Sequence, residues 1–497
     1  MLTMTDVFDP IEWGKSFIGD GLPPGPDDDF YTGINFAVDG YFGRMRTFIE
    51  AYREFGPVFT GRFIGFKMVW MIGAEANQYM YVDNWEDFAW WGESLDGHLA
   101  GLIGEGLLSS HGETHDKARK LLDPVFSREN LKTYTQRMID QTERKIQELE
   151  YGQEFDFYDW AYDTAILNAT ACFMGMDPDR TDTRYLHEHF DTCVKFYQKP
   201  FHLQALRGPF TPYAQFKKAK EKLDDFLYDE IEARRRNGGS SVDNILDRLL
   251  EAEEEGETFT DEEIHDQIMT LYWAGHDTTT SAVSWLVMLL GLNYSVYEKV
   301  KKEVRDRVGD QPVTVEEVTD GLPYLEMAMD EALRLYPPAW VAIRKALKPF
   351  ELYGHRIPEG TNVAFSSILT HRLPHLYEQP EAFHPERMKP KNKRDLPPGA
   401  YIPFGRGPRT CIGMNFAKYE IKLIVATLLR HFDFELLTGQ NYNGYPVATL
   451  TPETVEIRLK EPTESNRSVT VNGQINPTDS EQTTDADSGG ESDCPVH

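Results

Sequence analysis

Apolar positions follow two different spacings along this chain. Two short apolar runs between residues 55 and 75, separated by Gly65, predict a pair of strands. A second strand-rich stretch covers about 341–365. Between these stretches, from about residue 76 to 335, apolar residues recur at helical spacing. The pattern predicts a mainly α-helical protein with small β-sheets.

The ends of the chain differ from its middle. Length alone, at 497 residues, would suggest two to four domains, but hydrophobic residues run evenly to about residue 460. Residues 462–497 are rich in Ser, Thr, Asp, Asn and Gly and keep no apolar pattern. We therefore predict an N-terminal arm at 1–20, one large domain at 21–461 and a disordered polar tail at 462–497.

The composition excludes several classes of partner and location. A net charge of −30 argues against nucleic acid and anionic membranes as partners. This acidity fits a cytosol of high ionic strength and an ordinary soluble surface equally well. Four irregularly spaced cysteines do not form a secreted disulfide framework. With no signal peptide and no apolar run long enough to span a bilayer, we expect a cytoplasmic protein without a transmembrane anchor.

The longest predicted helix begins after Thr260, which forms a capping box with Glu263, and runs to about Leu292. Its middle reads A-G-H-D-T-T, which places Asp277 and Thr278 together. Glycine costs about 1 kcal/mol inside a helix, and a threonine can bend one. A helix opened here could pass protons inward from Asp277 through Thr278. The alternative is a packing kink with a solvated aspartate.

Cys411 lies in the most informative segment, F-G-R-G-P-R-T-C-I-G at residues 404–413. The glycines let backbone N–H groups approach the sulfur, and nearby positive charge lowers a thiol pKa. No second cysteine is close in sequence, so a CxxC metal site is excluded locally. A single thiolate on a metal suggests haem iron, while the alternative is a structural cysteine in a Gly-rich loop.

This segment resembles the cysteine signature of the cytochrome P450 superfamily, the haem-thiolate monooxygenases. The resemblance covers about residues 20–460, with the motifs in the order of the family. It implies a cytochrome P450 fold, haem b as cofactor and Cys411 as the ligand of its iron. It also implies that Arg409 pairs with a haem propionate, that Phe404 shields the sulfur and that the backbone near Gly413 tunes it.

Other positions match the family's motifs residue by residue. In the family, the acid–alcohol pair serves oxygen activation, which assigns a catalytic role to Asp277 and Thr278. The resemblance implies three further sets: propionate partners His115, Arg119 and Arg344; a structural triad Glu331, Arg334 and Arg387; and a hydrophobic substrate pocket at Trp273, Ala274, Ala339, Val341 and Thr449. For each pocket residue, ordinary core packing is the alternative.

Part of the chain is also similar to the sterol 14-demethylase branch, chiefly in 333–372 and 402–434. The chain departs from that branch at Asp277, where histidine is typical, and its 92–112 loop lacks the branch's tyrosine-centred signature. Sterol demethylation is therefore a minor alternative to oxidation of another hydrophobic small molecule, such as a lipid or terpenoid.

The implied reaction is RH + O₂ + two electrons + two protons → ROH + H₂O. A peroxygenase or isomerase of the same fold, and a haem-based gas sensor without turnover, are the alternatives. The chain has no nucleotide-binding G-x-G-x-x-G turn after a strand and no second cysteine cluster, which predicts a separate electron donor, either a ferredoxin or a flavoprotein. Its expected docking face presents Lys117, Lys120, Arg406, Lys418 and Lys422, unless these charges serve propionates and helix surfaces.

Overall fold

The computed structural model describes residues 22–26, 45–63, 66–89, 99–177, 181–197, 199, 201–204, 206–441, 444–446 and 449–462. The predicted arm at 1–20 lies outside the described residues, as does the predicted tail from 463 onward.

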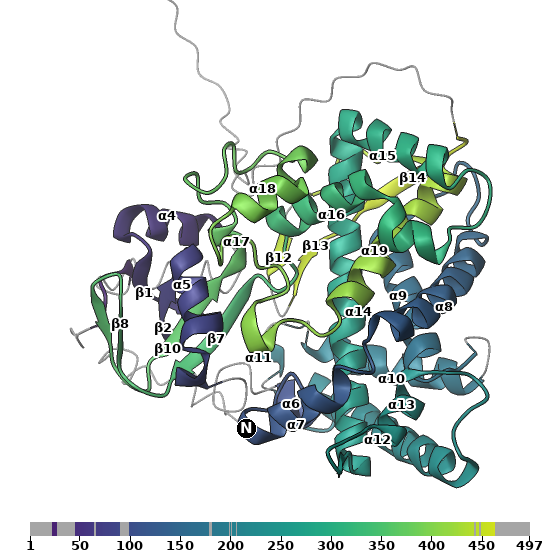
Figure 1. Ribbon diagram of the computed structural model, residues 1–497, viewed down its shortest axis with the longest axis horizontal. Coiled ribbons are helices and arrows are strands. Elements are labelled where there is room, and N and C mark those ends of the chain that lie inside the picture. The colour runs from purple at the N-terminus through teal and green to yellow at the C-terminus, as the bar shows by residue number, and fades with distance from the viewer. Residues whose placement is uncertain are drawn as a thin grey trace, which may run out of the picture.

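Helices make up most of the described chain (Figure 1). They are α4 (Met45–Phe55), α5 (Ala74–Gln78), α6 (Ala100–Ile103), α7 (Gly112–Leu122), α8 (Arg128–Ile146), α9 (Phe157–Phe173), α10 (Thr181–Tyr197), α11 (Phe201–Gln204), α12 (Pro212–Asn237), α13 (Ile245–Glu251), α14 (Asp261–Leu292), α15 (Tyr294–Arg307), α16 (Pro323–Leu335), α17 (Ser367–Thr370), α18 (Pro390–Asp395) and α19 (Met414–His431).

The strands form small sheets, so the prediction of a mainly α-helical protein is confirmed. They are β1 (Val58–Phe63), β2 (Phe66–Met71), β3 (Phe88–Ala89), β4 (Glu154–Asp156), β5 (Glu253–Glu254), β6 (Glu257–Thr258), β7 (Val341–Ala346), β8 (Phe350–Leu352), β9 (His355–Ile357), β10 (Asn362–Ser366), β11 (Asp433–Leu436), β12 (Gly444–Pro446), β13 (Leu450–Pro452) and β14 (Glu456–Lys460).

The two strand-rich stretches predicted far apart in the sequence join in one sheet. Its order is β1-β2-β10-β7-β3, and the two stretches meet where β2 and β10 pair in parallel, with Val363 opposite Val69. Figure 1 shows this sheet at the left, beside α4 and α5, with the larger group of helices around α14 at the right. In this sheet β7 lies near the group of helices around α14.

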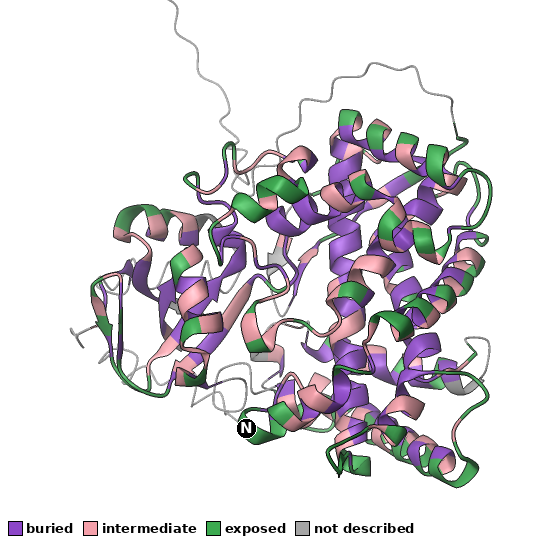
Figure 2. Cartoon of the chain, viewed as in Figure 1, coloured by how far each residue is buried: buried purple, intermediate pink, exposed green. Residues whose placement is uncertain are grey.

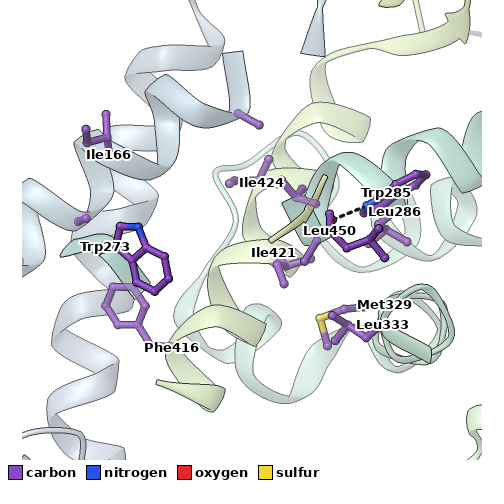
Figure 3. Packing of buried hydrophobic residues seen from close by; sticks show 14 of the residues in the cluster. Ile166, Trp273, Trp285, Leu286, Met329, Leu333, Phe416, Ile421, Ile424 and Leu450 are labelled. Atoms are coloured by element: carbon purple, nitrogen blue, oxygen red, sulfur yellow. Dashed lines mark hydrogen bonds between the residues drawn. The ribbon is translucent and has the colours of Figure 1, made fainter. Parts of the chain in front are cut away.

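Helix α14 is the axis of the core. It begins and ends at the predicted residues, and the capping box between Thr260 and Glu263 is present in both directions. Its residues are buried on nearly all sides, as expected of a helix surrounded by others, and it packs against α9, α16 and α19. Figure 2 shows α14 buried along most of its length, and Figure 3 shows Trp285 and Leu286 within the core.

No single helix among the described residues is both long and apolar enough to cross a membrane. Helices α14 and α15 reach that length and composition only together, across a bend of 113°.

Candidate active site

The Cys411 loop is a tight turn that only glycine permits. The Cys411 N–H donates to the Phe404 carbonyl at 2.9 Å, which closes the loop. Gly405 and Gly407 both adopt positive φ, at 68° and 69°. A Cβ on Gly407 would also lie 2.2 Å from the Tyr81 carbonyl oxygen. The glycines read from the sequence are thus required for the backbone path that presents Cys411.

The thiol of Cys411 lies in mixed surroundings. Burial raises its pKa, while a hydrogen bond from the Gly413 N–H and the charge of Arg119 act to lower it. The residue nevertheless presents accessible surface. Burial of the thiol and accessible surface of the residue together fit a sulfur that protein encloses on most sides and leaves open on one. A metal bound on that open side would deprotonate the thiol, and the Gly413 N–H would then stabilise the thiolate.

Four basic side chains gather around this loop from three elements. His115 and Arg119 come from α7, Arg344 from β7 and Arg409 from the short turn Gly407–Arg409 before the cysteine. Burial and then the charge of Arg344 lower the pKa of Arg409 to about 9. Burial lowers the pKa of His115, the adjacent Asp116 opposes this effect, and the charges of Arg409 and Arg119 add to it. Arg409 is therefore near both Arg344 and His115, and Arg119 is near His115.

Backbone carbonyls hold these guanidinium groups in place. Arg119 donates to the Thr410 carbonyl at 2.6 Å, and Arg409 donates to the Ser110 carbonyl at 2.8 Å. Arg344 is only 4% exposed. Repulsion among buried cations is relieved by a ligand that carries two carboxylates, which arginine binds in a bidentate fork. The residues present thus fit haem b: the basic groups suit its two propionates, and the thiol suits its iron.

The middle of α14 is continuous, and the predicted opening of the helix does not occur. The Thr278 hydroxyl donates to the Ala274 carbonyl at 2.7 Å, one turn back along the helix. Gly275 is explained by packing, because a Cβ there would lie 3.3 Å from the ring of Phe173 on α9. The glycine serves close contact between the two helices, as the packing alternative expects.

Asp277 is buried rather than solvated. It is 4% exposed, and its Oδ2 accepts a hydrogen bond from the Thr449 hydroxyl. Its charge also contributes to the raised pKa of Tyr158 and of Tyr162 on α9, after the larger effect of burial on each. A buried acidic group that is hydrogen-bonded to Thr449 therefore lies next to the back-bonded Thr278 in sequence.

The other predicted pocket residues lie in different surroundings. Trp273 is 8% exposed and belongs to the main hydrophobic cluster, as the core-packing alternative expects. Ala274 and Val341 are half-buried at the edge of that cluster, and Ala339 is exposed. The Thr449 hydroxyl is engaged by Asp277. Ala274, Ala339 and Val341 are thus the members with accessible surface.

The predicted triad comes together around a buried carboxylate. Glu331 and Arg334 are both fully buried on α16 and meet at 2.8 Å, while Arg387 reaches Glu331 at 3.2 Å from the turn Pro385–Met388. Arg334 also donates to the carbonyls of His371 and Pro380, at 2.8 and 2.7 Å. The triad therefore joins α16 to the segment that precedes the Cys411 loop.

His371 extends this connection, and the sequence analysis gave it no role. Its Nε2 accepts the Ile402 N–H at 3.0 Å, so Nδ1 carries the proton and donates to the Arg334 carbonyl at 3.2 Å. Burial lowers the pKa of His371 to about 3, which keeps the ring neutral. Ile402 lies two residues before Phe404, so the triad reaches the cysteine loop through His371.

Most basic residues of the expected docking patch are paired with carboxylates. Lys117 and Lys120 form ion pairs with Glu263 and Glu255, at 2.6 and 2.5 Å. Lys418 lies 3.5 Å from Asp330. These ion pairs agree with the alternative interpretation, in which the lysines serve helix surfaces rather than a docking face.

Lys422 cannot contribute to any docking surface. It is 1% exposed, and its ammonium group donates to the Thr319 carbonyl and to Glu326, at 3.2 and 3.3 Å. Burial lowers its pKa. Arg406 is the one predicted patch residue that is exposed and has no ion pair among the described residues.

Glu420 is a buried acid that the sequence analysis missed, although its position on an apolar stripe of α19 between Phe416 and Ile424 is a usable signal. It is 1% exposed and accepts a hydrogen bond from the Asn168 amide at 2.9 Å. Burial raises its pKa to about 8, and the hydrogen bond from Asn168 only partly opposes this effect. The carboxyl is therefore protonated in the folded protein at neutral pH.

We predict that Glu420 makes the folded state less stable as pH rises. The unfolded carboxyl ionises near its ordinary pKa of 4.5 and the folded one at about 8, so between these values folding must retain a proton that the unfolded chain releases. The penalty grows by up to about 1.4 kcal/mol per pH unit. In denaturant titrations from pH 5 to 8, Glu420→Gln should gain stability relative to the native protein.

The matched control for this titration is Glu129→Gln, at an exposed position on α8. It should follow the native protein at every pH. A constant difference between Glu420→Gln and the native protein across the range would show that Glu420 is ionised in the folded state.

Comparison with known proteins places this site in a family. The family model described as Cytochrome P450 matches residues 23–452. Putative cytochrome P450 120 of Synechocystis sp. is 31% identical over 426 residues, which cover 84% of this chain and 92% of that protein. Cyclooctat-9-en-7-ol 5-monooxygenase of Streptomyces melanosporofaciens is 31% identical over 344 residues, covering 68% of this chain and 74% of that protein.

Among solved structures, retinoic acid bound cyanobacterial CYP120A1 superposes with a TM-score of 0.78 at 29% identity. The match covers 88% of this chain and 99% of that one. Fold, motif order and sequence agree: the chain belongs to the cytochrome P450 family, whose members are monooxygenases that carry haem b.

Proposed function

We propose that this monooxygenase inserts one oxygen atom into a hydrophobic small molecule of the lipid, terpenoid or steroid type. The observation that carries the proposal is the accessible Cys411 thiol beside four basic groups, among which the charge of Arg344 acts on Arg409. The relatives support the substrate class, because one is named for a terpenoid alcohol and another has retinoic acid bound. The apolar, accessible side chains of Ala339 and Val341 also suit such a substrate.

In this proposal Cys411 binds the haem iron, and the Gly413 N–H stabilises its thiolate. His115, Arg119, Arg344 and Arg409 bind the propionates, which replace repulsion with charge-assisted hydrogen bonds. Haem bound there supplies the oxygen-activating chemistry. Phe404, half-buried against the core, covers the thiolate side of the loop.

Asp277 and Thr278 supply the protons that the reaction consumes. The Thr278 hydroxyl donates a hydrogen bond to the Ala274 carbonyl, so its oxygen remains able to accept a hydrogen bond from water. Asp277 is the neighbouring acid–base group, and its side chain is buried, at 4% exposed. Glu331, Arg334 and Arg387 have a structural role: they fix the approach to the Cys411 loop.

The electrons come from a separate ferredoxin or flavoprotein. With Lys422 buried and Lys117, Lys120 and Lys418 ion-paired, a broad basic patch does not support docking. Arg406, exposed in the cysteine loop, is the cation we retain for this contact. We also propose a cytoplasmic location, supported by the free thiols of Cys172, Cys193 and Cys411.

A panel of fatty acids, terpenoids and steroids tests this function. A substrate should shift the haem Soret band and then yield a hydroxylated product only with reduced donor and O₂. Product formed from peroxide without any donor would indicate a peroxygenase. Gas binding without product from any compound that shifts the band would indicate a sensor.

We predict that Thr278→Ala separates electron consumption from product formation. Without the hydroxyl, protons reach the site in the wrong order, and O₂ takes up two electrons and two protons to leave as H₂O₂. Product per electron should fall about a hundred-fold, at the low end of what general acid catalysis contributes. The measurement is product, peroxide and electron consumption in one assay, with haem content and substrate binding unchanged.

Thr280→Ala is the matched control. Thr280 makes the same type of bond, to the His276 carbonyl at 2.8 Å on the same helix, but lies fully buried on another face. It should retain the native ratio of product to electrons. Native coupling in Thr278→Ala as well would remove Thr278 from the mechanism.

A further inference from the structure

The β12–β13 hairpin is attached to one stripe of α14. Asp277, Ser281 and Trp285 follow one another at four-residue spacing and therefore share a face of the helix. The Ser281 hydroxyl and the Trp285 indole N–H both donate to the Leu450 carbonyl, at 2.5 and 2.9 Å. Figure 3 shows the second of these bonds. The backbone at Leu450 is thus fixed against α14 by two donors.

The other side of this segment is fixed as well. The Leu450 N–H donates to the Pro338 carbonyl at 3.0 Å, next to Ala339 of the predicted substrate pocket. Trp285 is fully buried and stacks on Tyr336 with ring centroids 3.8 Å apart. The first residue of β13 is therefore hydrogen-bonded both to α14 and to the segment before β7.

Thr449 projects from this base to Asp277. Its hydroxyl donates to Oδ2, and both side chains are buried, at 6% and 4% exposed. A hydroxyl that donates to a carboxylate stabilises the ionised form and limits its orientation. Tyr158 and Tyr162 of α9 are the titratable groups whose pKa responds to Asp277. Thr449 thus restrains the Asp277 carboxylate through one hydrogen bond.

We propose that Thr449 positions Asp277 for proton delivery, so that the hairpin beside the substrate pocket and the proton relay share one hydrogen bond. The inference rests on the proposed role of Asp277 in that relay. Thr449 touches neither the reacting atoms nor the cofactor in this role and acts only through Asp277. The family resemblance assigns Thr449 to the substrate pocket, and this contact gives it a second task.

Thr449→Val keeps the size and shape of the side chain and removes the hydroxyl. Product per electron should fall about ten-fold, the order expected when a charged group loses one hydrogen bond, with the difference recovered as H₂O₂. Thr449→Ser keeps the hydroxyl and should keep the native ratio. In the resting protein, the pH at which the Asp277 carboxyl protonates should rise in Thr449→Val, measured as the infrared band that Asp277→Asn removes.

Ser281→Ala is the matched control, because it removes a different hydrogen bond between α14 and the same hairpin. It should leave coupling unchanged, and a loss equal to that of Thr449→Val would assign the effect to a loosened hairpin and overturn the proposal.

A double-mutant cycle completes the test. Thr449→Val should have no further effect in an Asp277→Asn background if Thr449 acts through Asp277. Additive losses would overturn the positioning role while leaving the relay intact. Native coupling in Asp277→Asn alone would overturn the relay and the positioning role together.

Discussion

Cys411→Ser should abolish monooxygenase activity and the long-wavelength absorption band that the reduced carbon monoxide complex shows when a thiolate binds haem iron. Serine has nearly the same shape, but its hydroxyl is not ionised near neutral pH and donates far less electron density to a metal. The Gly413 N–H and the Arg119 charge, which favour an anionic sulfur, would then face a neutral group. We expect at least a hundred-fold loss of activity, within the range of catalytic contributions from a single essential group.

The other two described cysteines provide controls. Cys172 and Cys193 are fully buried, and burial raises the pKa of the Cys193 thiol to about 12. Cys172→Ala and Cys193→Ala should each keep the long-wavelength band. A band that persists in Cys411→Ser, or disappears in either alanine variant, would overturn the assignment of the iron ligand.

The parts of the fold that the sequence predicted best depend on short-range chemistry. Helix α14 begins at Asp261 because Thr260 and Glu263, three residues apart, satisfy each other's backbone N–H groups. The Cys411 loop was recognisable because its glycines are needed for positive φ within ten residues of chain. Such features are determined by neighbours in sequence and can be read from it.

The misassigned residues depend on partners far away in sequence. Lys117 pairs with Glu263, 146 residues along the chain, and Lys422 contacts Glu326 across 96 residues. No local pattern distinguishes such a lysine from one that faces solvent. The contact of Thr449 was not predicted for the same reason, because its partner Asp277 lies 172 residues earlier.

Glu420 and His371 are polar groups that the sequence analysis left without a task. Each is buried, a placement that is costly without hydrogen bonds. An acid on an apolar helix stripe is a signal that can be recognised, as for Glu420. No sequence pattern identifies the role of His371. Its ring bonds the Arg334 carbonyl and the Ile402 N–H, and only the tertiary structure brings these two groups together.

Arg334→Ala should unfold the approach to the cysteine loop and prevent stable haem incorporation. The substitution leaves the Glu331 carboxylate fully buried with only Arg387 and the His384 N–H to compensate it. It also removes the donors to the His371, Pro380 and Ala382 carbonyls. Breaking a buried ion pair by removing one partner costs about 3–5 kcal/mol, a large share of a typical domain's stability. The measurement is haem content after expression, with denaturant unfolding of the protein recovered.

Two variants show whether the uncompensated charge causes this loss. Arg236→Ala breaks an ion pair of similar sequence spacing, with Glu232, that is exposed on both sides at 67% and 64%, and it should change stability by less than about 0.5 kcal/mol. The double substitution Glu331→Leu with Arg334→Met removes both charges and fills the space with apolar atoms. Because replacing a whole buried ion pair by hydrophobic residues costs less than breaking it, the double variant should be more stable than Arg334→Ala. If the double variant is as unstable as Arg334→Ala, then the hydrogen bonds of Arg334 to the backbone hold the segment before the cysteine loop. The buried charge of Glu331 would not be the cause.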